Sequence, residues 1–365
     1  MSLQRVAFSP LHTFTRATNE TFFNQVVDSF GNVSYELQTA PSGTAVQNAY
    51  DPSTGEPLGL QLFEQRTNLL LRSQELNLSP WSSQLATVTP DYETAPDGTL
   101  TADRLVFAGG AFPQIFQSFT LTAGLSYTFS CWVKSDGTSQ IQQTLLLDGS
   151  TTAFTPTSTW QRVSVTVASS AGGSKAASIV TNSNSAPASS FLAWGAQLEA
   201  GAFVTPYIKT EATTATRNAS VAVINDIDES EWWNASEGTF VVEWNEGNNL
   251  KSTGILVAGT GGITPSDAYF GLQKRISANY ELTYMSTSSV GTVVSTGVPV
   301  TAGNHTATLR YIGNTVSLSV DGSAEISRTN VKRGQTILFI GLLLAGGTPL
   351  NGHIKSIIYY PSAGV

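Results

Sequence analysis

The sequence predicts an all-β protein in which an N-terminal extended arm precedes two β-sandwich (jelly-roll) domains. Short segments alternate apolar and polar residues, which is the period of a half-buried strand. Turn pairs such as Asp136-Gly137, Asp148-Gly149 and Gly313-Asn314 separate these segments. Only 12% of the 365 residues are charged, and the chain is long enough for two hydrophobic cores.

Residues 1–62 are expected to form the arm. Asp51-Pro52 and Thr54-Gly55 mark turns in this part of the chain. Its apolar residues are too scattered to build an independent core. We therefore expect an extended arm, or a small β-element that packs on something else, and we expect this segment to anchor the chain to other proteins.

Residues 63–217 are expected to form the first β-sandwich, because strand patterns recur there with turn residues between them. Two segments bracket this part of the chain, residues 63–71 (FEQRTNLLL) and 194–201 (WGAQLEAG). The clearest expected strands are residues 101–107, 114–121, 127–134, 140–147, 160–167 and 191–198.

Residues 218–235 are expected to be a linker with a short helical turn, because Asp226 could cap a turn that begins with acidic residues. Residues 236–365 then predict a second β-sandwich. Its expected strands are residues 238–244, 254–259, 269–273, 280–284, 305–311, 315–320, 336–341 and 352–360.

Composition excludes several classes of function. The formal net charge is −8 and no Lys/Arg cluster occurs, so we expect no nucleic-acid partner. No apolar run approaches the ~20 residues that span a bilayer, so we expect no membrane insertion. Cys131 is the single cysteine, which excludes an intramolecular disulfide and fits synthesis in a reducing cytoplasm.

The order of motifs resembles virion proteins of tailed bacteriophages. The two brackets and residues 94–103 (TAPDGTLTAD) resemble a carbohydrate-binding-module-like jelly roll. The second module is similar to concanavalin A-like, laminin-G-type jelly rolls through residues 238–243 (GTFVVE), 319–322 (SVDG) and 350–355 (LNGHIK). The arm resembles N-terminal segments of the same phage proteins through residues 14–17 and 50–60.

This resemblance implies a structural protein on the virion surface, either a tail fibre or a head fibre or decoration. The arm would bind other virion proteins, and the chain would form a homotrimer. Many copies would adhere together to host cell-surface polysaccharide. Two alternatives stay open: a purely structural virion component that binds no glycan, and a glycan hydrolase.

Glycan sites combine an aromatic platform for the sugar ring with amides and carboxylates for its hydroxyls. Aromatic and polar residues in irregular or edge positions are the candidates, namely Trp81, Phe112, Gln114, Gln117, Trp244, Tyr269, Lys274, Arg275 and Tyr280. For tryptophans within strands, core packing is the competing interpretation. A solvated loop pair is the competing interpretation for Lys274 and Arg275.

No cofactor and no catalytic residue are expected. Asp97, Asp103 and Glu199 could contribute oxygen ligands to a structural calcium ion, but the chain has no Asp-x-Asp-x-Asp loop. No His-x-x-x-His or Gly-x-Ser-x-Gly pattern is present, and the acidic residues are sparse. We therefore expect that the protein is not an enzyme.

Overall fold

The structure is a computed structural model. It describes residues 57–363 except 139, 247–252, 261–267, 276–278, 285–291 and 342–348. Before residue 57 it describes the backbone of four strands, β1 (Phe14–Thr15), β2 (Glu20–Val27), β3 (Val33–Ala40) and β4 (Ala49–Tyr50). None of the described segments is a helix that could cross a membrane.

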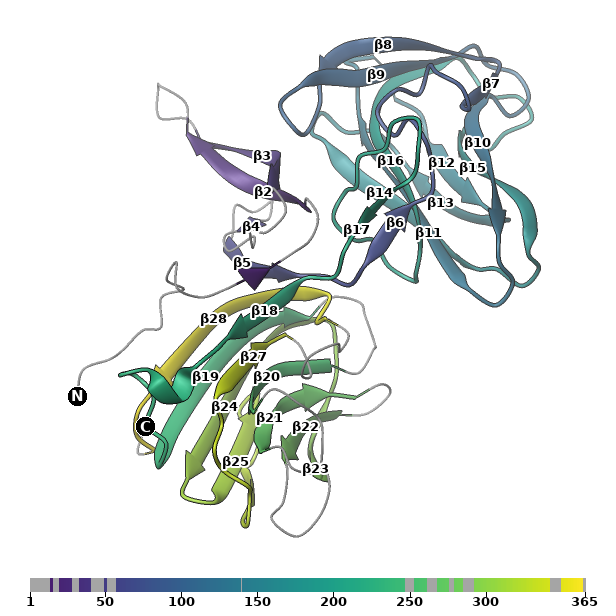
Figure 1. Ribbon diagram of the computed structural model, residues 1–365. Coiled ribbons are helices and arrows are strands. Elements are labelled where there is room, and N and C mark those ends of the chain that lie inside the picture. Colours follow the sequence, from purple (N-terminus) through teal and green to yellow (C-terminus); the bar gives the residue numbers. More distant parts are fainter. Residues whose placement is uncertain are drawn as a thin grey trace. The chain divides into compact units, whose positions relative to one another are not determined.

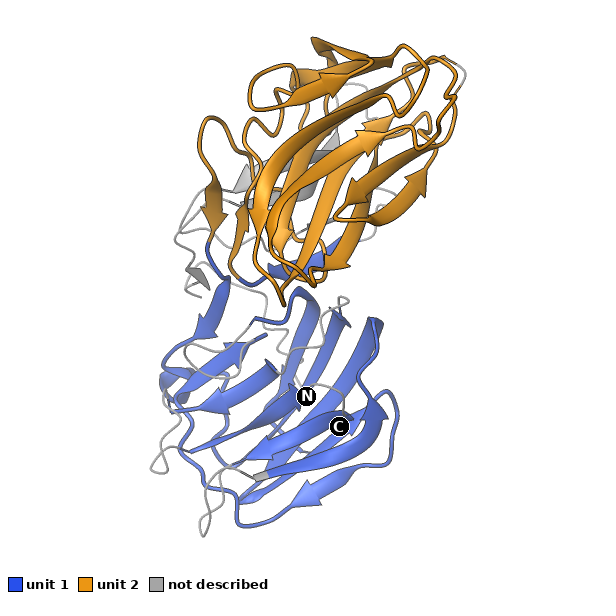
Figure 2. Cartoon of the chain, turned by 90° about the vertical axis from the view of Figure 1, so that its right-hand side faces the viewer, with its two compact units in different colours: residues 1–19, 40–64, 218–365 blue, residues 20–39, 65–217 orange. Residues whose placement is uncertain are grey.

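The described chain folds into two compact β-sandwich units, which confirms the all-β prediction with two sandwiches (Figures 1 and 2). One unit contains residues 20–39 and 65–217, and we call its 65–217 part the first sandwich. The other contains residues 1–19, 40–64 and 218–365, and we call it the second sandwich.

The first sandwich consists of two five-stranded antiparallel sheets. One sheet has the order β13 (Ser150–Phe154), β12 (Gln143–Leu147), β15 (Gly173–Val180), β10 (Gln114–Leu121) and β7 (Ser82–Gln84). The other has the order β14 (Gln161–Ala168), β11 (Ser126–Lys134), β16 (Ser189–Ala200), β9 (Leu100–Phe107) and β8 (Ala86–Thr94).

Two separate clusters of buried side chains stabilise the first sandwich. The larger core includes Phe107, Phe129 and Phe191. A smaller cluster contains Trp132, Trp194 and Tyr207, with ring centroids 4.7 Å apart for the last two residues. Burial of these aromatic rings removes the largest apolar surfaces of this unit from water.

The second sandwich consists of two seven-stranded sheets. One has the order β1, β18 (Val221–Ile224), β27 (Ile337–Ile340), β20 (Thr253–Gly259), β21 (Tyr269–Lys274), β22 (Asn279–Tyr284) and β23 (Thr292–Pro299). The other has the order β26 (Ile326–Arg328), β25 (Thr315–Val320), β24 (Gly303–Ile312), β19 (Glu237–Glu246), β28 (Gly352–Tyr360), β5 (Pro57–Leu62) and β4.

Parts of the expected arm and linker are strands of the second sandwich, namely β1, β4 and β5 from the arm and β18 from the linker. Strand β5, at the end of the expected arm, pairs with β28, and its Leu60 and Leu62 are buried in the core of the second sandwich. Strand β18, in the expected linker, pairs with β27. Leucines occupy every second position of β5, whereas β18 is apolar throughout and buries Ala222 and Ile224. The rest of the expected arm has no described side chains.

The expected helical turn is present as the 3-10 helix η1 (Ile227–Glu229). Asp228 and Glu229 provide acidic residues in its first turn. Asp226 is the N-cap residue, but it has a φ of 54° and its side chain makes no capping hydrogen bond.

The two bracketing segments meet in a buried seam of the first sandwich. Strand β6 (Arg66–Asn68) pairs with β17 (Ala215–Arg217). The buried Asn68 amide donates to the carbonyls of Ala196 and Ile208, and its oxygen accepts from the N–H groups of Leu70 and Leu198. One side chain thus joins three chain segments.

Arg66 and Glu199 form the charged part of this seam. Arg66 donates to the carbonyl of Ala200, and its Nε lies 3.4 Å from Glu199 Oε2. Gly201 follows directly, with a φ of 141°, and a Cβ atom there would lie 2.1 Å from the Arg66 guanidinium. The close approach of this cation explains why the segment ends in glycine.

We predict that Asn68→Ala destabilises the protein by about 3 kcal/mol or more, because it leaves several buried backbone groups without partners at ~1–3 kcal/mol each. Urea denaturation followed by tryptophan fluorescence measures this loss. Asn184, an exposed asparagine of the same unit, provides the control Asn184→Ala. Equal midpoints for the two variants would contradict the role of the seam.

A polar pocket in the first sandwich

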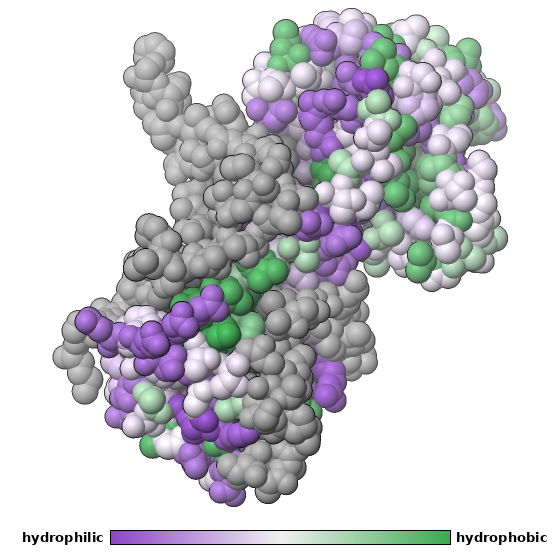
Figure 3. All heavy atoms as spheres, viewed as in Figure 1, coloured by the Kyte–Doolittle hydropathy of each residue, from purple (hydrophilic) through white to green (hydrophobic). Residues whose placement is uncertain are grey.

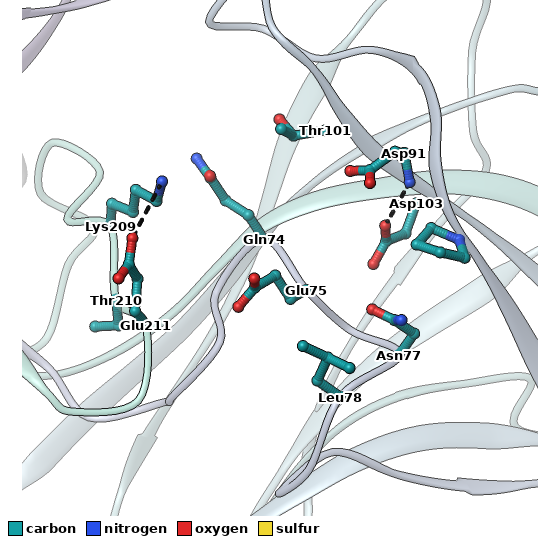
Figure 4. A pocket seen from close by; sticks show the side chains of 11 residues that line it. Gln74, Glu75, Asn77, Leu78, Asp91, Thr101, Asp103, Lys209, Thr210 and Glu211 are labelled. Carbon is teal, nitrogen blue, oxygen red and sulfur yellow. Dashed lines mark hydrogen bonds and ion pairs between the residues drawn. The ribbon is translucent and has the colours of Figure 1, made fainter.

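A pocket of about 240 Å³ opens in the first sandwich (Figure 4). Three chain segments line it: the loop between β6 and β7, the paired strands β8 and β9, and the chain that follows β16. The lining side chains are mainly amides, carboxylates and hydroxyls, and they comprise Gln74, Glu75, Asn77, Leu78, Pro90, Asp91, Thr101, Asp103, Lys209, Thr210 and Glu211.

The loop wall of the pocket is fixed by hydrogen bonds to its own backbone and to β9. Asp103 Oδ2 accepts from Leu76 N–H at 2.7 Å. The indole N–H of Trp81 donates to the carbonyls of Leu71 and Arg72, both at 3.1 Å. Leu76 and Trp81 pack into the larger core, so the polar loop is anchored by apolar side chains.

The opposite wall is paired to the same loop. Thr210 N–H donates to Ser73 Oγ at 2.8 Å, and Thr210 Oγ1 donates to the carbonyl of Leu70 at 2.7 Å. Arg72 N–H donates to the carbonyl of Glu211 at 2.8 Å. These contacts continue the Asn68 seam and place Lys209 and Glu211 at the pocket.

A bulge in β8 supplies the third wall. The register with β9 shifts between Thr89 and Glu93, so Pro90 and Asp91 leave the regular ladder. Asp91 has a φ of 52°, a left-handed conformation that aspartate tolerates better than most residues. Its N–H donates to Asp103 Oδ1 at 3.2 Å, so Asp103 holds both the bulge and the loop.

Asp103 is the most perturbed carboxyl of the pocket. Only 1% of its surface is exposed. Burial raises its pKa to about 7, although the two backbone N–H donors act in the opposite direction. The nearby charges of Asp91 and Glu75 raise the pKa further. Asp103 therefore changes its charge close to neutral pH.

The pocket has the chemistry of a site for a small, hydroxyl-rich ligand. In Figure 4 the Gln74 amide points into the space between Lys209 and Asp91. Gln74 and Asn77 provide amide donors and acceptors, while Leu78, 39% exposed, and Pro90 provide apolar surface. The lining is more polar than that of most ligand pockets, which suits a ligand rich in hydroxyl groups.

The four expected glycan residues of the first sandwich lie outside the pocket lining, and two of them, Trp81 and Gln117, meet at the carbonyl of Leu71. Trp81 and Gln117 are buried, and Gln117 exchanges hydrogen bonds with the backbone of Leu71. Neither offers a free face to a sugar ring. Phe112 stays 38% exposed, and Gln114 bonds to Gln84 at 3.1 Å on the surface.

Four of the five candidates in the second sandwich are buried. Trp244 and Tyr280 are core residues with ring centroids 5.3 Å apart. Tyr269 packs against Val257 and Phe339 on another face of the sheet. Lys274 is 1% exposed and forms a buried ion pair with Glu246, so it is not the solvated loop charge of the competing interpretation.

Arg275 is the exception in the second sandwich. Its side chain is 53% exposed and lies 3.5 Å from Glu281. In the described part of the second sandwich it is the expected glycan residue that solvent reaches most directly. Its partner Glu281 is buried and also accepts a hydrogen bond from Gln273 Nε2 at 3.0 Å.

The three calcium candidates belong to separate hydrogen-bond networks. Asp97 accepts from Thr99, Asp103 accepts from the backbone, and Glu199 accepts from Thr205 and pairs with Arg66. Among the described residues, no group of three His, Cys, Asp or Glu side chains could hold a metal ion.

Cys131 is packed among apolar residues of the larger core. Burial raises its pKa to about 12, so it stays a neutral thiol at physiological pH.

Sequence reasoning did not identify the pocket. Gln74, Asn77, Lys209 and Glu211 lie in irregular segments, and nothing in their local pattern shows that these segments pair with each other. One local signal is present: the Pro90-Asp91 pair interrupts a strand pattern and indicates a bulge, which forms one wall of the pocket.

No protein-family model and no curated protein matches the chain. Among solved structures, it is similar to the CBM40 of the Ruminococcus gnavus IT-sialidase bound to α2,3-sialyllactose, with 14% identity over 36% of this chain and 79% of that chain, and a TM-score of 0.31.

Two tandem structures cover more of the chain. The N-terminal CBM22-1–CBM22-2 tandem of Paenibacillus barcinonensis Xyn10C matches with 10% identity over 81% of this chain and 97% of that chain, with a TM-score of 0.30. Domains LG4-5 of the mouse laminin α1 chain match with 8% identity over 82% of this chain and 93% of that chain, with a TM-score of 0.26. Because the sequence identities and TM-scores of these matches are low, they carry no argument about function, which has to be argued from the pocket itself.

We predict that Asp103 gives the protein a pH-dependent stability. Its pKa is raised to about 7 in the folded state, so the protonated carboxyl group is favoured by folding. This contribution to the unfolding free energy is fully present below about pH 4 and is lost as pH rises through 7. The wild-type minus Asp103→Asn difference in unfolding free energy should therefore fall by up to about 4 kcal/mol from pH 4 to pH 8. Urea titrations at each pH measure it, and a constant difference would contradict the assignment.

Proposed function

We propose that the protein is a non-catalytic glycan-binding surface protein and that the pocket of the first sandwich holds the sugar. The observation that carries this proposal is the convergence of amides, carboxyl groups and two hydroxyls on one pocket whose walls are fixed by buried hydrogen bonds. Preorganised walls reduce the entropy cost of binding a weakly held ligand.

The size of the pocket supports a short glycan. Its volume of about 240 Å³ is below the ~300–1,000 Å³ usual for drug-sized ligands. A single sugar ring with part of a neighbour suits this space. Leu78 and Pro90 can contact the apolar face of a ring while Gln74 and Asn77 meet its hydroxyls.

We further propose that many copies act together on the surface of a bacteriophage particle. The support is the order of sequence motifs, from the arm through the two jelly rolls. In this proposal the protein is made in the host cytoplasm, binds other virion proteins through its N-terminal arm and forms a homotrimer. A weak sugar site then becomes effective because linked copies raise the local concentration of binding sites.

Hydrolysis is a weaker proposal for this pocket. A glycosidase needs a general acid that can donate its proton to the glycosidic oxygen. Asp103 has the raised pKa of such an acid, but both of its oxygens accept backbone N–H groups. Its role in the pocket is to fix the walls.

A purely structural role without glycan binding has one favourable observation. Leu85 and Phe112 are 48% and 38% exposed, and both have φ values near 50°. Bulky residues in this conformation are uncommon and often mark contact sites. In Figure 3 hydrophobic residues are interspersed with hydrophilic ones on the visible face of the first sandwich. A neighbouring virion protein could cover Leu85 and Phe112.

We predict that Asn77→Ala weakens binding of the full chain to its glycan about threefold to tenfold, because it removes one net hydrogen bond of ~0.5–1.5 kcal/mol. A glycan array identifies the ligand, and calorimetry on the best hit measures the change. Asn77 is exposed, so the fold should not change. The matched control is Asn182→Ala, another exposed asparagine outside the pocket.

Two results would contradict the proposal. A silent array would favour the purely structural role. Loss of binding in Phe112→Ala with normal binding in Asn77→Ala would move the site from the pocket to the surface around Leu85 and Phe112.

A further inference from the structure

The pocket carries an unbalanced negative charge. Its lining has four carboxyl groups and one ammonium group, and three of the carboxyl groups belong to Glu75, Asp91 and Glu211. Lys209 lies 3.6 Å from Glu211, and Arg72, just outside the lining, lies 2.8 Å from Glu75. Within the described part of the chain, neither Asp91 nor Asp103 forms an ion pair with a lysine or arginine. Because burial raises the pKa of Asp103 to about 7, its carboxyl group is mostly protonated at pH 6, and Asp91 is the carboxylate that lacks a cationic partner.

The carboxylates are close enough to influence each other. After burial, which is the largest cause, the charges of Asp91 and Glu75 raise the pKa of Asp103. Like charges that converge on one cavity repel each other, and a ligand cation would relieve this repulsion. A ligand carboxylate or sulfate would increase it.

The lining favours an organic cation over a metal ion. The carboxylates do not form a group of three that could hold a metal among the described residues. The pocket also contains two amides and the apolar Leu78 and Pro90, which a metal ion does not use. A sugar with an ammonium group would use both the charges and the neutral groups.

We propose that this pocket selects sugars that carry a free amine over sugars that carry a carboxylate or sulfate. The inference rests on the proposed glycan function and names the class of glycan. Asp91 is the residue that distinguishes the two classes, because it borders the pocket, is exposed and has no cationic partner among the described residues. N-acetylated and neutral sugars should bind with intermediate affinity.

Calorimetry with the full chain can test the selection, using tetramers of glucosamine, N-acetylglucosamine and glucuronic acid. Measurements at about pH 6 keep the sugar amine protonated, since this is below the ~7.7 of an α-amino group. We expect the glucosamine tetramer to bind about tenfold or more tighter than the glucuronic acid tetramer at low salt. In 1 M salt the difference should shrink.

A matched pair of variants separates the pocket from the overall charge of −8. Asp91→Asn and Asp148→Asn remove the same charge, and both positions have left-handed backbone, with φ values of 52° and 44°. Asparagine tolerates this conformation. Asp148 lies outside the pocket and pairs with Lys175 at 2.6 Å. We expect Asp91→Asn to reduce the amine preference about threefold, and Asp148→Asn to leave it unchanged.

Several outcomes would overturn the inference. Equal or tighter binding of the glucuronic acid tetramer would do so, as would equal effects of the two variants. Binding of the N-acetylglucosamine tetramer without an amine preference would overturn the selection and leave the proposed glycan function intact. If none of the three tetramers binds, the amine preference is wrong, and the glycan array then decides whether the proposed glycan-binding function is correct.

Discussion

The buried amide of Asn68 is the interaction on which the functional part of the first sandwich depends. It joins β6, β16 and the chain near Ile208 through four hydrogen bonds, in a place that water does not reach. Buried backbone groups need partners, and an asparagine side chain can donate and accept at once. Other hydrogen bonds join the same segments, such as Leu69 N–H to the carbonyl of Leu198 and Ile208 N–H to Gln197 Oε1, but Asn68 is the side chain that bonds to both distant segments at once.

The pocket is a consequence of this seam. Once Asn68 fixes the chain near Ile208, Ser73 and Thr210 can pair, and Lys209 and Glu211 are placed opposite Gln74. Asp103 then connects the loop wall to the bulge of β8. Binding residues on loops thus gain their positions from a rigid support, as ligand sites generally require.

Much of the fold could be predicted from the sequence. The alternation in residues 114–121 and 127–134 predicted strands that the structure contains as β10 and β11. The same reasoning passed over β5 and β18, because each is short and lies beside irregular sequence. A short apolar segment of this kind can be assigned as a strand only when the distant strand that pairs with it is known.

The candidate site could not be predicted in the same way. The chemistry of aromatic side chains predicts sugar contact, but Trp81 and Trp244 are buried, because burying their large apolar rings in the core stabilises the fold. The sequence makes Asp103 a candidate calcium ligand, but both of its oxygens accept hydrogen bonds from backbone N–H groups. The pocket residues converge through long-range pairing, which no local pattern in the sequence records.

Hydrogen–deuterium exchange of the full chain, with and without its best glycan, tests most directly whether the pocket is the binding site. We predict slower exchange in residues 72–78, 90–92 and 209–211, with residues 236–363 unchanged. Protection confined to the second sandwich, or to the segments around Leu85 and Phe112, would contradict the assignment of the site.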